Sequence, residues 1–307
     1  MTEFNLRLKA SVDANKFRYG YPWIYSNEII SDRRTKSLLP GSFCKLVDYN
    51  KNPICLVTVN PKSKIFARVM DYNLETTVDA YWLKDKISKA LAKRKEIFRD
   101  PFYRLVNAEA DELPGLIVDR FDNVIVMQPN AFWAENMSEI IANSIKEVCS
   151  IDVVIKNASG RSRRLEGLDD KNSVFFGDLP EAAISVPMNG AIYKADVHEG
   201  QKTGLFYDQR QNHKFVASLA NGKTVLDVFC HVGGFGLAAI AAGASKVSFV
   251  DSSANALDLV REGASEMMAS SKMNIIRGDA FSVLRELLDS NNSYDIVICD
   301  PPAFVTS

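Results

Sequence analysis

Thr224 to Gly236 reads T-V-L-D-V-F-C-H-V-G-G-F-G and predicts a strand, a turn and the start of a helix. The apolar and β-branched residues up to Phe229 are typical of a short buried strand. Gly233 and Gly234 then allow a tight turn with no Cβ between the backbone and a ligand. The apolar run 235–242 predicts a helix whose free N–H groups face that turn. Such an arrangement forms a cradle for a nucleoside-containing cofactor.

Two acids indicate which cofactor the cradle holds. Val247–Asp251 (V-S-F-V-D) predicts a second buried strand that ends in a carboxylate, with Ser252 directly after it. A carboxylate at that place can accept hydrogen bonds from both hydroxyls of a ribose. Asp227 lies inside the first strand and suits a cofactor that carries an ammonium or sulfonium group, as S-adenosylmethionine does. The spacing is not G-x-G-x-x-G, so a nicotinamide oxidoreductase is the more distant alternative.

A third signal lies near the end of the chain. Tyr294–Phe304 reads Y-D-I-V-I-C-D-P-P-A-F and predicts another buried strand that runs into Asp-Pro-Pro. The prolines fix the backbone and hold the Asp300 carboxylate and the Phe304 ring at the carboxyl end of the strand, where open α/β sheets bind ligands. Asp-Pro-Pro at this position is typical of methyltransferases that act on nucleic-acid bases and amide nitrogens. The sequence therefore predicts an S-adenosylmethionine-dependent methyltransferase.

The remaining pattern from residue 214 onward alternates helices and strands. Helices are expected over 214–219, 254–268 and 281–288, and a third strand over 274–277. This alternation predicts a parallel, Rossmann-like α/β sheet. Asp279 and Ala280 follow the third strand, and Asp279 either caps the next helix or faces the ligand.

Composition and charge limit the class of protein. The chain is 47% hydrophobic and 24% charged, with a net charge of −1, so RNA contacts must come from local patches rather than a generally basic surface. No apolar run approaches the ~18 residues of a membrane span, and the N-terminus has no signal-peptide core. Five cysteines and three histidines have no paired spacing. We expect a cytoplasmic, metal-free protein with no membrane partner.

The first 72 residues are predicted to form a compact β module. Strands are expected over 6–10, 41–47, 54–59 and 65–69, between Pro, Gly and Asn breaks. Residues 20–29, G-Y-P-W-I-Y-S-N-E-I, resemble the opening of a PUA module, a pseudo-barrel found in RNA-modifying enzymes. An ordinary β domain with a core tryptophan is the alternative. Candidates for phosphate contact, each more often plain surface when taken singly, are Arg7, Lys9, Lys16 and Arg18.

A central α+β region is predicted over 73–190, with helices over 82–98 and 132–149. Leu113–Asp119 (L-P-G-L-I-V-D) and Arg163–Leu168 (R-R-L-E-G-L) resemble segments of the bacterial cytosine-C5 methyltransferases of large-subunit ribosomal RNA. The arginines at 161, 163 and 164 either contact RNA or pair with Glu166.

The strongest part of that resemblance is residues 199–213, which contain G-Q-K-T-G-L-F-Y-D-Q-R. In the family this segment precedes the catalytic domain and closes over the cofactor, and the resemblance gives that role to Lys202, Thr203, Tyr207 and Arg210. The family usually has arginine where His213 stands. A plain domain linker is the alternative reading.

The resemblance covers essentially the whole chain and implies three domains. These are a PUA-like RNA-binding module over 1–72, a central α+β domain over 73–190 and an S-adenosylmethionine-dependent methyltransferase domain over 191–307. It implies ribosomal RNA as the partner and C5 of a cytosine as the target, with Asp300 bonded to the base and Phe304 stacked on it. The residues expected to hold the cofactor are Asp227, Phe229, Gly233, Gly234, Phe235, Asp251, Ser252, Asp279, Ala280 and Asp300.

The family's nucleophilic cysteine lies in a Ser/Thr-Cys-Ser motif that residues 1–307 do not contain. Cys230 and Cys299 are expected in packed core. The resemblance therefore places the nucleophile beyond Ser307 and predicts that these residues form the first part of a longer enzyme with an incomplete sheet. Two other functions stay open, an Asp-Pro-Pro methyltransferase acting on a guanine or adenine nitrogen and an inactive RNA-binding relative. The sequence also leaves a homodimer open.

Overall fold

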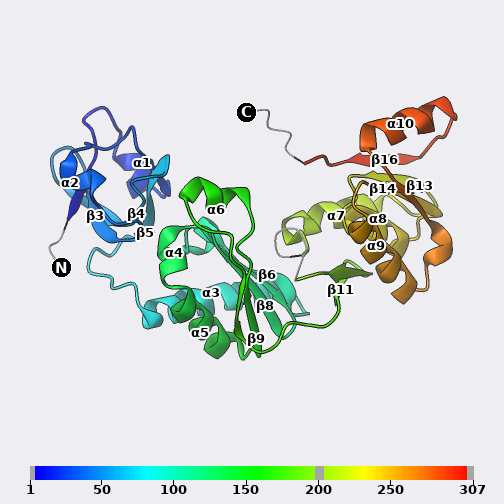
Figure 1. The fold of residues 1–307 in the computed structure, drawn as a ribbon, viewed down its shortest axis with the longest axis horizontal. Coiled ribbons are helices and arrows are strands. Elements are labelled where there is room, and N and C mark those ends of the chain that lie inside the picture. The colour runs from blue at the N-terminus through cyan, green and yellow to red at the C-terminus, as the bar shows by residue number, and fades with distance from the viewer. Residues whose placement is uncertain (1–3, 198–203, 303–307) are drawn as a thin grey trace. The chain divides into compact units, whose positions relative to one another are not determined.

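The computed structural model describes residues 4–197 and 204–302, which fall into two compact units, Met1–Leu179 and Pro180–Ser307 (Figure 1). The multidomain architecture expected from the sequence is present. Among these described residues, no helix combines the length and the apolar character that a bilayer span requires.

The first unit begins with a five-stranded sheet in the order β1-β3-β4-β5-β2. Its strands are β1 (Asn5–Arg7), β2 (Trp23–Tyr25), β3 (Phe43–Val47), β4 (Pro53–Val59) and β5 (Ile65–Asp71). β1 pairs with β3 in parallel, and the other pairs are antiparallel. Two one-turn helices, α1 (Asn15–Arg18) and α2 (Arg33–Lys36), lie in the connections. The alternating apolar residues of the strands fill one core together with Phe17 of α1.

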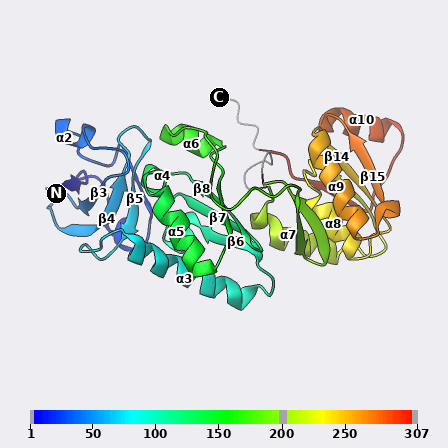
Figure 2. The ribbon, with the colours of Figure 1, turned by 60° about the horizontal axis from the view of Figure 1, so that its bottom comes forward.

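A second five-stranded sheet follows in the same unit, in the order β10-β9-β8-β7-β6 (Figure 2). Its strands are β6 (Phe102–Asn107), β7 (Leu116–Phe121), β8 (Val124–Pro129), β9 (Val153–Lys156) and β10 (Ser173–Phe176), with the short helix η1 (Ala108–Asp111) between β6 and β7. Its helices are α3 (Ala80–Ile97), α4 (Phe132–Asn136), α5 (Ser138–Cys149) and α6 (Arg161–Glu166). Leu83, Ile87 and Leu91 of α3 recur at helical spacing and enter the core of this sheet.

The single helix predicted over 132–149 is interrupted. The break falls at Met137, and the Ser138 hydroxyl donates to the carbonyls of Ala134 and Glu135 at 3.0 and 2.8 Å. A serine that bonds back to earlier carbonyls competes with the helical pattern and often bends a helix. The apolar periodicity continues through the break, which is why the sequence pattern did not reveal it.

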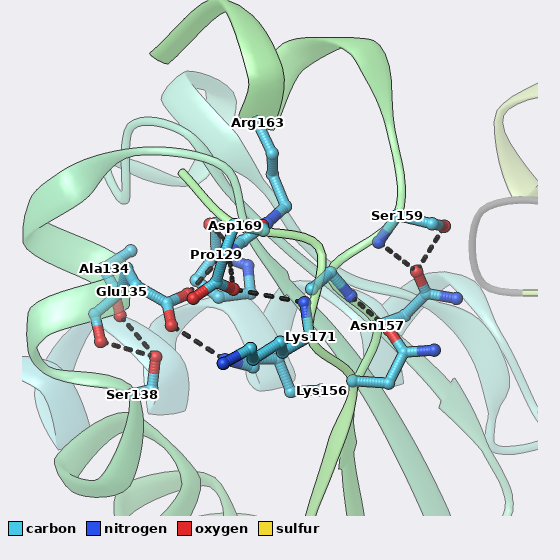
Figure 3. Close-up of polar contacts among 12 residues, drawn as sticks. Pro129, Ala134, Glu135, Ser138, Lys156, Asn157, Ser159, Arg163, Asp169 and Lys171 are labelled. Atoms are coloured by element: carbon cyan, nitrogen blue, oxygen red, sulfur yellow. Dashed lines mark hydrogen bonds and ion pairs between the residues drawn. The ribbon is translucent and has the colours of Figure 1, made fainter. Parts of the chain in front are cut away.

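Arg163 of α6 is fully buried, so its predicted contact with RNA is wrong, and so is its predicted pairing with Glu166. Its guanidinium donates to the carbonyls of Pro129 and Asp169 and pairs with Glu135 at 2.8 Å (Figure 3). Lys156 reaches the other oxygen of Glu135 at 2.7 Å. The arginine therefore fixes α6 to the second sheet.

The second unit begins with a hairpin that the sequence analysis did not anticipate, β11 (Ile184–Met188) and β12 (Ala191–Ala195). Its turn is Asn189-Gly190, and both residues have positive φ, 55° and 77°. Asn-Gly is the pair that two-residue hairpin turns of this conformation favour. The hairpin packs on helices α8 (Gly234–Ala241) and α9 (Ala254–Glu266).

A four-stranded, all-parallel sheet forms the rest of this unit, in the order β15-β14-β13-β16. Its strands are β13 (Thr224–Val228), β14 (Lys246–Asp251), β15 (Met273–Arg277) and β16 (Ile296–Cys299). Its helices are η2 (Tyr207–Gln209), α7 (Arg210–Ser218), α8 (Gly234–Ala241), α9 (Ala254–Glu266), η3 (Ser270–Lys272) and α10 (Ala280–Asp289). Leu226 and Val228 of β13 face a core shared with α10, whereas α8 packs on the same sheet through Gly236, which meets Phe249. The strands β13, β14 and β15 follow one another towards one edge of the sheet, whereas β16 lies on the other side of β13. Open α/β sheets bind ligands at the point where the strand order changes in this way.

The prediction that the fourth strand and Cys299 are buried is wrong. β16 pairs with β13 and forms an edge of the described sheet, with Val297 58% exposed and Cys299 exposed. An apolar run looks alike in a central strand and in an edge strand, so periodicity could not separate the two.

Candidate functional site

A cavity of about 520 Å³ opens in the second unit at the carboxyl ends of β13, β14 and β16. Its wall combines the turn after β13, the start of α9, the segment before α7 and the Asp-Pro-Pro sequence. The predicted site residues that line it are Phe229, Gly234, Phe235, Asp251, Ser252 and Asp300. The fold thus brings together predicted residues that are up to 71 positions apart, counted from Phe229 to Asp300.

The turn after β13 is held in an unusual backbone conformation. Phe229, His231 and Gly233 have φ values of 62°, 50° and 79°. Positive φ values are energetically unfavourable for residues other than glycine, and they persist only where the surrounding structure enforces them. The Cys230 N–H donates to the carbonyl of Val250 at 3.1 Å, and the Gly233 N–H donates to the carbonyl of Cys230 at 2.8 Å. The cradle is therefore already formed.

Asp251 lies at the end of β14 and ties that strand to the turn. Its Oδ2 accepts the His231 N–H at 2.8 Å, and its Oδ1 accepts the Ser253 N–H at 2.9 Å. Each carboxylate oxygen has a second lone pair for another donor. Asp251 lines the cavity, and these two bonds fix the orientation of its carboxylate, as the acceptance of two ribose hydroxyls requires.

Asp227 is only 1% exposed and does not line the cavity. It accepts the Gly236 N–H at 2.8 Å and so fixes the first turn of α8. The pKa of Asp227 is raised to about 7, chiefly by burial; the Gly236 N–H opposes this rise, and the nearby charges of Asp251 and Asp300 contribute to it. The direct contact of this carboxylate with the cofactor stays a prediction, and the contact that the structure contains is with the helix start.

His213, where the family has arginine, packs beneath the glycine turn. Its ring lies 4.5 Å from that of Phe235, and a Cβ at Gly234 would fall 2.6 Å from its Cε1 and Nε2. Burial lowers the pKa of His213 to about 4, so the imidazole is neutral at pH 7. The Tyr193 hydroxyl of β12 donates to the Gly234 carbonyl at 3.1 Å from the hairpin side. Only glycine fits at position 234.

Other predicted cofactor residues lie outside the cavity wall. Asp279 caps α10, accepting the N–H and hydroxyl of Ser282 at 3.0 and 3.1 Å, and Ala280 is buried under the same helix. Gly233 supports the turn from behind, against Leu237 and Val260. Tyr207 is buried, and Arg210 is half-buried with its carbonyl accepting from Asn189 at 2.9 Å. Lys202, Thr203 and Phe304 lie outside the described residues.

The sequence analysis missed several lining residues, among them Phe206, His231, Asn255 and Leu259. The Phe206 and His231 rings meet edge to face, with centroids 5.0 Å apart. Phe206 lies in the motif before α7 and His231 in the glycine-turn motif after β13, so their membership of these motifs could have indicated that they line the site. Asn255 and Leu259 lie one helical turn apart on α9, which begins right after Asp251 and Ser252. The described residues hold no cluster of three or more His, Cys, Asp or Glu side chains suited to a metal ion.

The cavity suits a nucleoside cofactor by size and chemistry. Its volume is within the range of about 300–1,000 Å³ that small-molecule sites have. It offers aromatic walls at Phe229 and Phe235, an oriented carboxylate at Asp251 and a glycine turn with no side chain in the way. The N-terminus of α8 lies at that turn, and its free N–H groups favour a carboxylate such as that of an amino acid.

Comparison with known protein families gives two matches. Residues 164–307 match the S-adenosylmethionine-dependent methyltransferase family, and residues 6–72 match the PUA-like domain. Both agree with what the motifs in these regions predicted. S-adenosylmethionine is therefore the cofactor of this methyltransferase domain.

Curated relatives match along most of the chain. The ribosomal RNA large subunit methyltransferase I of Shewanella frigidimarina is 33% identical over 288 residues, covering 92% of this chain and 72% of the relative. The protein of the same name from Aliivibrio fischeri is 33% identical over 295 residues, covering 94% and 74%. This chain thus spans about three quarters of the length of either relative.

Solved structures show the same fold at lower identity. A Streptococcus mutans protein described as a SAM-dependent methyltransferase superposes with a TM-score of 0.84 at 19% identity, covering 99% of this chain and 78% of that one. A second structure, described as a methyltransferase complexed with S-adenosylhomocysteine (SAH), has the same TM-score at 18% identity, covering 100% and 77%.

Proposed function

This chain belongs to the ribosomal RNA large subunit methyltransferase I family, and from that premise we propose that it methylates C5 of a cytosine in large-subunit ribosomal RNA. One observation carries the proposal. Asp251 and Asp300, at the ends of β14 and β16, line a single cavity. An acid suited to a ribose and an acid suited to a base amino group therefore border the same space.

The cofactor supplies an electrophilic methyl group, and the described residues hold it and the base. Asp251 accepts the ribose hydroxyls, Phe229 and Phe235 form apolar walls, and Gly233 and Gly234 let the backbone approach. Asp227 keeps the turn in place through Gly236. The resemblance assigns Asp279 and Ala280 to the adenine, although neither lines the cavity. The resemblance assigns Tyr207 and Arg210 to covering the cofactor; Lys202 and Thr203, which have the same assignment, lie outside the described residues.

Asp300 is assigned to the target base. Its carboxylate is exposed, lines the cavity and precedes two prolines that restrict its backbone. It can accept a hydrogen bond from the exocyclic amino group of a base taken out of its stack, on which Phe304 is assigned to stack.

We assign the nucleophile to neither Cys230 nor Cys299. Burial raises the pKa of the Cys230 thiol, and the charges of Asp227 and Asp251 add to this shift, so little thiolate forms. Cys299 does not line the cavity, and side chains of successive strand residues point to opposite faces, away from Asp300. Either cysteine changed to alanine should leave methyl transfer largely intact.

The test uses the protein expressed from its whole gene, with S-adenosylmethionine and unmodified large-subunit ribosomal RNA. Nucleosides are then analysed by mass spectrometry, and 5-methylcytidine is the expected product. A methyl group on a guanine or adenine nitrogen would instead support the rival Asp-Pro-Pro activity. RNA binding without any methylated nucleoside would support an inactive relative.

Asp251→Ala should weaken S-adenosylmethionine binding by about 1–3 kcal/mol, because two ribose hydroxyls lose a charged acceptor. Calorimetric titration measures the change. Asp251→Asn is the matched control, since it keeps one acceptor oxygen and should lose less. Equal affinity for wild type and Asp251→Ala would remove this residue from the site.

Asp279→Ser separates the two roles of that residue. Serine is as good a helix cap as aspartate, so the melting temperature should stay within about 2 °C. If the carboxylate accepts a hydrogen bond from the adenine amino group, cofactor affinity should still fall about fivefold or more. Unchanged affinity with unchanged stability would leave Asp279 with its cap alone.

A further inference from the structure

Helix α6 has one buried face and one exposed face. Arg163 and Glu166, three positions apart, are both buried, whereas Arg161, Arg164 and Leu165 are exposed. This division follows from helical spacing, since residues three or four apart share a face. The exposed face therefore presents two guanidinium groups beside an apolar side chain that is 67% exposed.

The buried face ties α6 to the turn between β4 and β5. The Glu166 carboxylate accepts the Asn60 amide at 2.7 Å, the Ser63 hydroxyl at 3.1 Å and the Arg68 guanidinium at 2.6 Å. The Asn60 amide also donates to the Glu166 carbonyl at 3.0 Å. A buried carboxylate with three donors is costly to displace, because any lost donor leaves charge unsatisfied. The turn and the helix are thus held against each other.

The same turn carries two more cations. Lys62 and Lys64 are exposed, and they flank Ser63, which bonds to Glu166. The Lys62 N–H donates to the Asn60 side chain at 3.1 Å, so the turn is internally fixed. Lys62, Lys64, Arg161 and Arg164 together are named the α6 basic surface.

These cations differ from the phosphate contacts proposed on sequence grounds. Lys16 pairs with Glu28, Arg18 pairs with Asp48 at 3.2 Å, and Arg7 donates to the Tyr49 carbonyl at 2.8 Å and lies over its ring. Of that set, Lys9 is exposed and has no ion pair among the described residues. In contrast, all four members of the α6 basic surface are exposed and form no ion pair within residues 4–197 and 204–302.

We propose that the α6 basic surface contacts the phosphates of the ribosomal RNA substrate. The inference rests on the proposed function, because it names a second place where the protein holds that RNA. A net charge of −1 means that RNA binding must come from a local cluster, and two arginines can each bind a phosphate through paired N–H groups. Leu165 adds an apolar contact for a sugar or an unstacked base.

The test compares two variants with equal loss of charge. One changes all members of the surface to glutamine, at Lys62, Lys64, Arg161 and Arg164. The matched control changes exposed cations elsewhere in the same unit that also lack ion pairs in the described parts, at Lys36, Lys93, Lys95 and Arg99. Binding to large-subunit ribosomal RNA transcribed in vitro is measured at several salt concentrations, with thermal unfolding to verify that both variants fold.

Each phosphate contact contributes roughly 0.7–0.9 to the slope of log affinity against log salt. The surface variant should therefore show a slope shallower by about 3 and an affinity about tenfold or more lower at physiological salt. The control should stay within about twofold of wild type. Equal slopes for the two variants would overturn the inference.

A second measurement needs no variant. Wild-type protein is cross-linked to the same RNA containing 4-thiouridine, and the attached peptides are identified by mass spectrometry. Adducts within 60–64 and 161–165 are expected, and adducts confined to other segments would refute the surface. Polyglutamate serves as a probe for an acidic protein partner. If the surface variant lost binding to polyglutamate but kept its binding to RNA, the inference would also be refuted, in favour of an acidic protein.

Failure of this inference and failure of the proposed function are distinguishable. Suppose that the whole-gene protein methylates ribosomal RNA but that the surface variant and the control variant have the same KM for RNA. The inference about the α6 basic surface is then wrong, and the proposed function stands. If wild type neither binds nor methylates that RNA, both are wrong. If the surface variant keeps its kcat but has a raised KM for RNA, both are supported.

Discussion

Gly236→Ala should destabilise the second unit by about 3 kcal/mol, near the upper end of what overpacking a core costs. A Cβ at this position would fall 2.1 Å from Cε1 and 2.7 Å from Cζ of Phe249. Phe249 is fully buried in β14, so its ring has little room to move. Helix α8 would have to shift away from the sheet and carry the glycine turn with it. Denaturant unfolding of the chain measures the loss, and cofactor affinity should fall with it.

The double variant Gly236→Ala, Phe249→Leu is the control, because the shorter side chain vacates the space that the methyl group needs. It should regain part of the lost stability, although the smaller leucine leaves some space unfilled. An unchanged unfolding midpoint for Gly236→Ala alone would show that α8 can move freely on β14.

Arg163→Met should cost the first unit about 3 kcal/mol or more, as breaking buried ion pairs does. Glu135 would keep Lys156 but lose its second cation, and the carbonyls of Pro129 and Asp169 would lose a charged donor. Unfolding in denaturant gives the difference in free energy. The neighbouring substitution Arg164→Met removes the same charge from an exposed side chain and should change stability by less than about 0.5 kcal/mol.

The two arginines thus predict opposite outcomes for one kind of change. Arg164→Met should weaken RNA binding and spare stability, while Arg163→Met should lower stability first. If both variants unfold at the same denaturant concentration as wild type, the buried network at Glu135 does not hold α6 in place.

The sequence predicted the first three strands of the methyltransferase sheet well. The first three were expected over 225–229, 247–251 and 274–277, and the structure has them at Thr224–Val228, Lys246–Asp251 and Met273–Arg277. The first two strands are largely apolar and buried, and all three are followed by a glycine turn or an acid. The same signals located the lining residues Phe229, Asp251 and Asp300, because parallel strands bring their carboxyl ends to one edge.

Other features depend on contacts that no local pattern records. The hairpin β11–β12 was missed although Asn189-Gly190 is a turn signal, because Pro187 interrupts the alternation around it. The exposure of Cys299 depends on what lies beside β16, not on its own apolar neighbours. Arg163 was expected either to contact RNA or to pair with Glu166, three positions away, and instead it reaches Glu135, 28 positions away.

The PUA-like segment is bonded to the rest of the first unit and is not a separate structural module. The PUA-like match ends at residue 72, yet that segment sends Asn60, Ser63 and Arg68 to the buried carboxylate of Glu166. Trp23 and Arg68 likewise bond to Glu109, at 2.8 and 3.2 Å. An excision at residue 72 would leave two acids in the remainder without their donors and an arginine in the fragment without its acids. A graft of this module onto another enzyme should therefore carry residues 1–179 as one piece, and the shorter fragment should exchange its amide hydrogens faster.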